Sequence, residues 1–322
     1  MAQHIGVGTG TLVEEALKNM ATLLNEPAGK FPIKGYLFLI GTAFFTSISY
    51  VCGKAVNKDI GPDKVTFFWF FGAFLFSLFV LPVVESQRRE LKNIKSYKLI
   101  FFLSSILTAL GAALWIYSIR SIGIPLTSFL MKAQTLFTLV LGLVFLGERF
   151  NRGEMVGLVI TIIGGVIVAY QREINLIIGT ITAISAAFFY SLLTFSVRRV
   201  ARNLNMLTVA ALRIFGVSLV VAIYLLVSGR FELPSVTDFI YMVIGGLTGA
   251  YIAKACQFQS IKLLGIARST AVMPLESIFV IIFSYTIFHE LPSLVKLAGG
   301  FMIIVGVIFL VIFRSGESSL TR

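Results

Sequence analysis

Five charged side chains lie inside long apolar stretches of this sequence, and their chemistry could define a site. They are four cations and one acid: Lys132, Arg213, Lys254, Arg268 and Glu276. A charge near the centre of a bilayer costs at least about 2.5–3.5 kcal/mol, so such groups are expected to face a polar interior and to be partnered. Together they carry a formal charge of +3, which favours ligands with a carboxylate or a phosphate. The alternative is a structural ion pair, or, for Arg213 and Arg268, a side chain that reaches the membrane surface.

Two of these residues have a specific predicted role. Lys254 is expected to help neutralise a substrate carboxylate or phosphate. Glu276 is expected to bind a substrate ammonium group when charged and to release it when protonated, which makes it the candidate for proton coupling. The competing interpretation is that Glu276 permanently cancels a lysine and contributes only to folding. Pro274 is expected to kink the helix beside this acid and to free backbone carbonyls there.

Aromatic and amide side chains in the same stretches complete the candidate substrate-binding site. Buried Trp and Tyr rings need a partner for their polar atoms, so a polar cavity suits them as a set, although packing or anchoring at a membrane interface is the favoured explanation of each one taken alone. The set is Trp115, Gln134, Gln257, Tyr50 and Tyr190. His4 and His289 are far apart in the sequence, and neither metal-ligand spacing nor a phosphate-binding glycine loop is found. We therefore expect no metal or cofactor and no enzymatic activity.

The composition indicates a membrane protein. Hydrophobic residues make up 57% of the 322 residues, charged residues make up 13%, and the mean hydropathy is +0.93, more apolar surface than a soluble protein of this size can bury. The net charge of +12 is interpreted as loops that face anionic lipid rather than as a nucleic-acid surface. The expected partners are a small-molecule substrate and membrane lipid, with no nucleic acid.

Ten apolar runs are long enough to be membrane spans. If the amino terminus is cytoplasmic, 16 Lys and Arg residues fall in cytoplasmic segments and 7 on the opposite side. The positive-inside rule then places both termini in the cytoplasm, and a bacterial inner (plasma) membrane is the expected location. Before the first run lies a tail that is either an amphipathic helix or disordered. The runs cover roughly 35–54, 65–84, 98–118, 124–146, 154–170, 175–196, 206–227, 237–258, 266–288 and 295–313.

The sequence repeats itself at a spacing of 142 residues. Residues 118–164 align without a gap on residues 260–306, with ten identities in 47 positions. Five spans per repeat is an odd number, so the second repeat is predicted to be inverted relative to the first, an arrangement typical of transporters with a site between the repeats. Glycines on 157–164 and 245–249 are expected to allow close helix packing, with dimerisation as the alternative.

This layout resembles the drug/metabolite transporter superfamily, specifically its ten-helix proteins with two EamA-type repeats. The resemblance rests on the duplication and on the acidic turns Leu146-Gly147-Glu148 and Phe288-His289-Glu290, each followed by a glycine-rich helix. The second turn departs mildly, because His289 stands where the first has Gly147. The resemblance implies an all-α integral membrane fold of ten transmembrane helices in two inverted five-helix repeats, 34–171 and 172–314, with cytoplasmic tails 1–33 and 315–322.

The leading functional hypothesis is a secondary transporter that works by alternating access. The mixture of lysine and glutamate favours an amino acid or an amino-acid-like cofactor such as S-adenosylmethionine. Nucleotide-type or other organic anions are the next alternative. Drug efflux is disfavoured because residues 35–54 contain no acid. A passive channel and a membrane-embedded enzyme are the alternatives from other classes, and substrate, direction, proton coupling and oligomeric state (monomer or homodimer) stay open.

Overall fold

The structure is a computed structural model, and it describes residues 33–80, 98–146, 151–170, 174–200, 206–264 and 273–318. Within these ranges every regular element is a helix, as predicted. Seven of the described helices are long and apolar enough to cross a membrane, so the chain is an integral membrane protein. The count of ten spans stays a prediction. The proposed amphipathic helix before residue 33, and Arg268, lie outside the described residues.

The helices follow the predicted apolar runs closely, and among the described residues the run 124–146 is divided between two helices. In the first half the helices are α2 (Ile33–Ala55), α3 (Pro62–Val80), α5 (Lys98–Ile122), α6 (Ile124–Leu130), α7 (Ala133–Leu146) and α8 (Arg152–Ala169). In the second half they are α9 (Ile174–Val200), α10 (Met206–Val227), α11 (Val236–Gly245), the π-helical segment η3 (Gly246–Ile252), α12 (Ala253–Leu264), α14 (Leu275–Phe288) and α15 (Leu294–Ser318).

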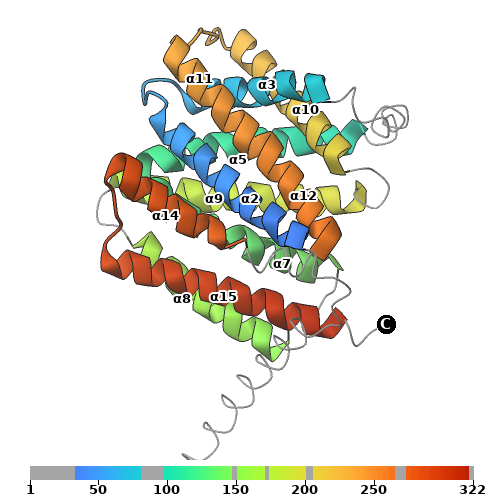
Figure 1. Cartoon of the computed structure of the whole chain (residues 1–322), viewed down its shortest axis with the longest axis vertical. Coiled ribbons are helices and arrows are strands. Elements are labelled where there is room, and N and C mark those ends of the chain that lie inside the picture. Colours follow the sequence, from blue (N-terminus) through green and yellow to red (C-terminus); the bar gives the residue numbers. More distant parts are fainter. Residues whose placement is uncertain are drawn as a thin grey trace, which may run out of the picture.

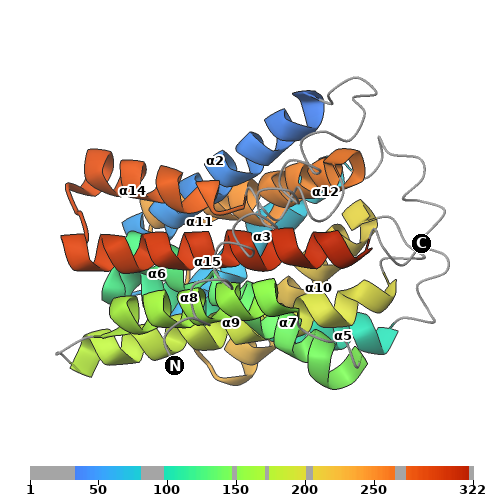
Figure 2. The same ribbon diagram turned by 90° about the horizontal axis from the view of Figure 1, so that it is seen from below.

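The helix pairs of one half are mirrored in the other. By their order, α2, α3, α5, α6–α7 and α8 correspond to α9, α10, α11–α12, α14 and α15. The contact of α5 with α9 is matched by that of α12 with α2, and the contact of α7 with α9 by that of α14 with α2. Helix α3 packs on its own counterpart α10, and α8 packs on its counterpart α15; Figure 1 shows the first pair near the top and the second near the bottom of the molecule (see also Figure 2). Exchanging the two halves therefore preserves these main packed pairs.

Glycines allow α8 and α15 to pack backbone against backbone. A Cβ atom on Gly157 would meet the carbonyl oxygen of Gly306, and one on Gly164 would meet the carbonyl oxygen of Gly299. Gly245 of α11 packs in the same way on the ring of Trp69 in α3. The predicted packing role of these glycines is thus confirmed within one chain, while the choice between monomer and homodimer stays open.

Turns lie at two positions that correspond in the repeat. The run predicted over 124–146 is divided by a turn at Met131 and Lys132, between α6 and α7. A turn at Met273 and Pro274 begins the described part of the ninth predicted run, just before α14. Both turns are closed by backbone hydrogen bonds between residues three apart, such as Lys132 N–H to Phe129 O (3.1 Å) and Glu276 N–H to Met273 O (3.2 Å). The turn at Pro274 lies where a kink was predicted, and residues 265–272 before it lie outside the described part; no break at Lys132 was predicted.

Candidate functional site

The two turns place a lysine and a glutamate in direct contact. Nζ of Lys132 lies 3.2 Å from Oε2 of Glu276, and both side chains are buried. Lys132 follows the carboxyl end of α6, and Glu276 is in the first turn of α14. A helix end of negative partial charge therefore faces the lysine and one of positive partial charge faces the acid, typically worth 0.3–1 kcal/mol each. Two of the residues predicted for the site, Lys132 and Glu276, are thus in direct contact.

Helix α2 closes one side of the pair. The Ser47 hydroxyl donates to the backbone carbonyl of Glu276 at 3.1 Å and to that of Ala43 at 2.7 Å. One turn further on, buried Tyr50 lies close enough to Glu276 to interact with it electrostatically. Its ring packs edge-on against Trp115 of α5, with centroids 5.0 Å apart. Tyr50 and Trp115 thus form an aromatic wall beside the ion pair, as the sequence hypothesis requires.

Lys254 approaches from α12 without joining the ion pair. Its Nζ donates to Oε1 of Gln257 at 2.9 Å, and Nε2 of Gln257 lies 3.8 Å from Sδ of Met273, at the turn before α14. Lys254 also interacts electrostatically with Lys132, Glu276 and Arg213. Within the described residues the carboxylate of Glu276 is therefore paired with Lys132, while Lys254 keeps an ammonium group bonded only to a neutral amide.

Arg213 of α10 belongs to the same cluster. Its Nε is buried and has no hydrogen-bond partner within the described part of the chain, and its guanidinium interacts electrostatically with Tyr190 of α9. Sequence reasoning favoured a surface-reaching or structural role for this residue. In the structure Arg213 lies near Lys254 with its buried Nε donor unused, and a buried donor without a partner typically costs 1–3 kcal/mol.

Gln134 lies on the other side of the broken helix. Its Nε2 donates to the backbone carbonyl of Tyr190 at 3.4 Å and to Oγ1 of Thr194 at 3.2 Å. These bonds tie α7 to α9 and position the start of α7, next to the turn that carries Lys132. Of the ten predicted site residues, nine lie in described segments, and the structure links all nine to this region; Arg268 lies outside them. Ser47 was missed, and as a lone serine in an apolar run it carried no signal in the sequence.

Polar contacts join the two halves at the end of the bundle that carries the α2–α3 loop, which we call the α2–α3 end. Among the described residues, three ion pairs cross between the halves there. The backbone N–H of Asn57 also donates to Oδ1 of Asp238 at 2.8 Å. Lys64 holds the pKa of the Glu232 carboxyl below its usual value, so that contact persists as the pH falls until this lowered pKa is reached. The ion pairs are Lys54 with Glu290, Lys64 with Glu232, and Arg230 with Asp63.

The comparison with known families agrees with this two-part architecture. The EamA-like transporter family matches residues 33–170 and again residues 177–312. The chain belongs to the EamA-like transporter family. In this EamA-like transporter, Lys132 lies in the first matched segment and Glu276 in the second, so the buried ion pair joins the two repeats.

Similar proteins include several that are named as transporters. An "uncharacterized transporter" of Methanothermobacter thermautotrophicus is 23% identical over 300 residues, covering 86% of this chain and 85% of the relative. An "S-adenosylmethionine uptake transporter" of Rickettsia conorii is 25% identical over 286 residues, covering 87% of this chain and 94% of the relative. The protein of that name from Rickettsia prowazekii is also 25% identical, with 87% and 92% coverage.

A solved crystal structure shares the fold of this EamA-like transporter. It superposes with a TM-score of 0.58 at 13% sequence identity, covering 86% of this chain and 97% of that one. At this identity the similarity concerns the arrangement of helices alone. The chemistry of the site therefore has to be argued from the residues of this chain. The described residues include no group of three metal-binding side chains.

The cluster at the repeat interface has an unbalanced charge. Within the described residues, Lys132 and Lys254 interact with the carboxylate of Glu276, and Arg213 interacts with Lys254, so this cluster has two positive charges in excess. An excess of this sign would attract a hydrogen-bond-accepting anion to Lys254 and Arg213. Charge-assisted hydrogen bonds of this kind are roughly twice as strong as neutral ones.

Proposed function

We propose that this protein is a secondary transporter that moves a small metabolite carrying both a carboxylate and a cationic group by alternating access. An amino acid or an amino-acid-like cofactor such as S-adenosylmethionine is the substrate that fits best. The observation that carries the proposal is the buried Lys132–Glu276 ion pair. It lies at the turns of Lys132 and Pro274, which correspond in the repeat, and it joins the two repeats. Transporters of this general architecture bind substrate at broken helices between repeats.

The excess positive charge provides the carboxylate subsite. Lys254 presents an ammonium group, and Arg213 has a buried Nε without a partner in the described residues. Both groups have already lost much of their hydration, so an incoming carboxylate gains strong bonds at little added desolvation cost. Gln257, which is bonded to Lys254, orients that ammonium group.

Glu276 and the aromatic wall provide the cationic subsite. A substrate ammonium or sulfonium group that approaches Glu276 competes with Lys132 for the same carboxylate, and the faces of Tyr50 and Trp115 attract a cation as well. S-adenosylmethionine carries a carboxylate, an ammonium, a sulfonium and a flat adenine ring, which together match these elements. The two Rickettsia relatives named above as S-adenosylmethionine uptake transporters support this choice.

Replacement of one ion-pair partner by a charged group of the substrate would link substrate binding to a movement of the two repeats relative to each other. Lys132 and Glu276 lie on different repeats, so a substrate that replaces one partner with its own charged group changes what holds the repeats together at the centre. Nucleotide-type anions are the second candidate substrate, because the cluster carries more cations than acids.

Counterflow in proteoliposomes tests the proposal. Vesicles loaded with unlabelled S-adenosylmethionine should accumulate labelled S-adenosylmethionine from outside, and the accumulation should saturate. S-adenosylhomocysteine lacks the sulfonium charge and adenosine lacks the amino-acid part, so each should compete less well. Preferential exchange of a nucleotide would select the second candidate, whereas linear, non-saturating flux would indicate a channel and overturn the proposal.

A pair of variants makes this assay specific to the cluster. Arg213→Gln removes the unpartnered buried cation and should weaken competition by carboxylate-bearing substrates about tenfold, which corresponds to roughly 1.4 kcal/mol. Lys58→Gln removes an exposed cation of the α2–α3 loop and should leave exchange unchanged. Equal behaviour of the two variants would place the carboxylate subsite elsewhere.

A further inference from the structure

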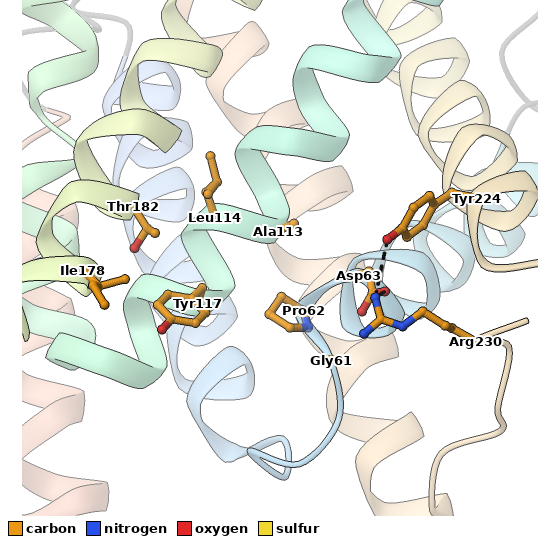
Figure 3. A pocket seen from close by; sticks show the side chains of 10 residues that line it. All are labelled: Gly61, Pro62, Asp63, Ala113, Leu114, Tyr117, Ile178, Thr182, Tyr224 and Arg230. Carbon is orange, nitrogen blue, oxygen red and sulfur yellow. Dashed lines mark hydrogen bonds and ion pairs between the residues drawn. The ribbon is translucent and has the colours of Figure 1, made fainter. Parts of the chain in front are cut away.

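A second polar feature lies away from the central cluster, in a cavity of about 350 Å³ at the α2–α3 end (Figure 3). Its wall is mainly apolar, and it lies between α3, α5, α9 and α10, so both repeats line it. Figure 3 shows Asp63, Arg230 and Tyr224 gathered on one side, facing Ile178 and Thr182 across the cavity.

Helix α5 separates this cavity from the central cluster. Leu114 and Tyr117 line the cavity, whereas Trp115 packs on Tyr50 and on Trp69, and Ile116 is 1% exposed. Tyr117 and Tyr224 are 38% and 50% exposed, on a part of the helix surface that is apolar and expected to face lipid. The cavity therefore opens toward the membrane and not toward the proposed substrate site.

The polar side of the cavity combines one cation, one anion and one hydroxyl. Nη1 of Arg230 lies 3.4 Å from Oδ2 of Asp63 and 3.4 Å from the Tyr224 hydroxyl. Both distances are long for hydrogen bonds, and the Arg230 side chain is 59% exposed, so the guanidinium has donors left for another acceptor. A phosphate could accept from Arg230 and Tyr224, while an ammonium group could donate to Asp63.

The polar and apolar parts lie at different depths. Asp63 is the second residue of α3, and Arg230 follows the end of α10 at Val227. Thr182 and Ala113 lie eight and nine residues inside the nearest ends of α9 and α5, which is about 12–14 Å at the rise of an α-helix. An amphiphile bound here therefore has its charged group at the helix ends and its apolar part alongside the buried helix turns, as a lipid does in one leaflet.

The geometry points to a specific phospholipid site in this cavity, with a zwitterionic headgroup that carries a primary ammonium, as in phosphatidylethanolamine. The phosphate binds Arg230 and Tyr224, the ammonium binds Asp63, and the upper part of an acyl chain lies against Leu114 and Ile178. Such a lipid bridges the two repeats at the α2–α3 end. The site is independent of the substrate that the central cluster carries.

Native mass spectrometry of the purified full-length protein tests this proposal directly. The protein is released from detergent after incubation with equal amounts of phosphatidylethanolamine, phosphatidylcholine and phosphatidylglycerol. One phosphatidylethanolamine per chain should be retained at least fivefold more often than either competitor, because phosphatidylcholine has no ammonium N–H and phosphatidylglycerol has no ammonium group. Equal retention of the three lipids, or preference for phosphatidylglycerol, overturns the proposal.

Matched variants locate the retained lipid. Arg230→Gln removes the phosphate donor, and Leu114→Trp fills the apolar part of the cavity; each should lower phosphatidylethanolamine retention at least fivefold. The controls are Lys58→Gln, an exposed cation in the α2–α3 loop, and Ile163→Trp, a 47% exposed apolar position on α8. Retention that survives Arg230→Gln unchanged overturns the proposal even if Leu114→Trp fails to fold, because Arg230 is exposed and its replacement leaves the packed helices intact.

Discussion

At the scale of residues, the molecule is organised around charges that are expensive to bury. Lys132 and Glu276 lie 3.2 Å apart with both side chains 9% exposed, so each removes most of the cost of burying the other. Breaking a buried pair by removing one partner typically costs 3–5 kcal/mol, because it leaves the other charge uncompensated. A substrate that supplies the missing charge relieves the same penalty, which is why such a pair suits a binding site.

Replacing Glu276 by glutamine separates a transport role from a folding role. Glu276→Gln keeps the shape of the side chain and removes its ability to take up a proton. If Glu276 links transport to protons, the variant should still exchange substrate between the two sides of a vesicle, but a pH gradient should no longer drive accumulation. Accumulation that still follows the pH gradient in the variant would contradict a coupling role for this carboxylate.

Lys254 should act on substrate affinity and not on folding. Because its ammonium group is bonded to the neutral side chain of Gln257, Lys254→Ala leaves no charged partner behind. Binding of a carboxylate-bearing substrate, measured by a ligand-induced shift of thermal unfolding, should weaken about tenfold or more, or roughly 1.4 kcal/mol. Lys254→Arg should recover part of the affinity. A variant that unfolds, while its surviving folded fraction binds normally, would make Lys254 a structural residue.

At the scale of elements, broken helices and glycine contacts decide where the charges lie. The turn at Met131–Lys132 exposes the ends of α6 and α7, and the turn at Met273–Pro274 does the same for α14. On the other side of the fold, α8 and α15 approach each other through Gly157 and Gly306. Close contact of these helices keeps the two repeats at a fixed separation at their edge.

The contact between α8 and α15 offers a matched pair of glycine substitutions. In Gly157→Ala the new methyl group would meet backbone atoms of Gly306 and Leu310, whereas in Gly165→Ala nothing lies within 4 Å of it. Gly157→Ala should destabilise the protein by about 1–3 kcal/mol through overpacking. Gly165→Ala should be neutral or stabilise it by up to about 1 kcal/mol, because alanine favours the helix.

Thermal unfolding of both variants in the same detergent measures the difference. A lower unfolding midpoint for Gly157→Ala than for Gly165→Ala is the expected result. Equal midpoints would mean that α8 and α15 do not pack backbone against backbone in the folded protein.

At the scale of the whole molecule, two repeats of similar sequence pack so that the main helix contacts have counterparts. The α2–α3 end is joined by ion pairs between the repeats, including Lys54 with Glu290. Exposed ion pairs typically contribute only 0–1 kcal/mol each, so this end is closed by contacts that are individually weak. Weak contacts of this kind can be broken and formed again during transport.

The orientation of the whole molecule is tested by cysteine labelling in cells. In a background with Cys52→Ala and Cys256→Ala, Asn57→Cys on the exposed α2–α3 loop should react with an impermeant reagent added from outside. Arg152→Cys, at the exposed start of α8, should react only after the membrane is permeabilised. This result follows from the positive-inside rule, which puts both termini in the cytoplasm. Labelling of Asn57→Cys from the cytoplasmic side alone would reverse the predicted topology.

Composition and repetition were sufficient to establish the class of this protein. Apolar content, the duplicated pattern at 142 residues and the glycine positions predicted a helical membrane protein of two repeats, and the family match confirms it. These properties can be inferred from sequence because each depends on local composition and spacing, and the bilayer imposes one rule on every span: backbone polar groups must be satisfied within the helix.

Only the tertiary structure decided which charges meet. The sequence left Glu276 with two possible lysines, and the fold pairs it with Lys132 while Lys254 bonds to Gln257. The break at Lys132 has no proline to announce it, and the sequence analysis interpreted residues 124–146 as one continuous span. Partner choice depends on helix rotation and on separations of a few ångströms, which arise from packing across the whole chain and have no signature in any one segment.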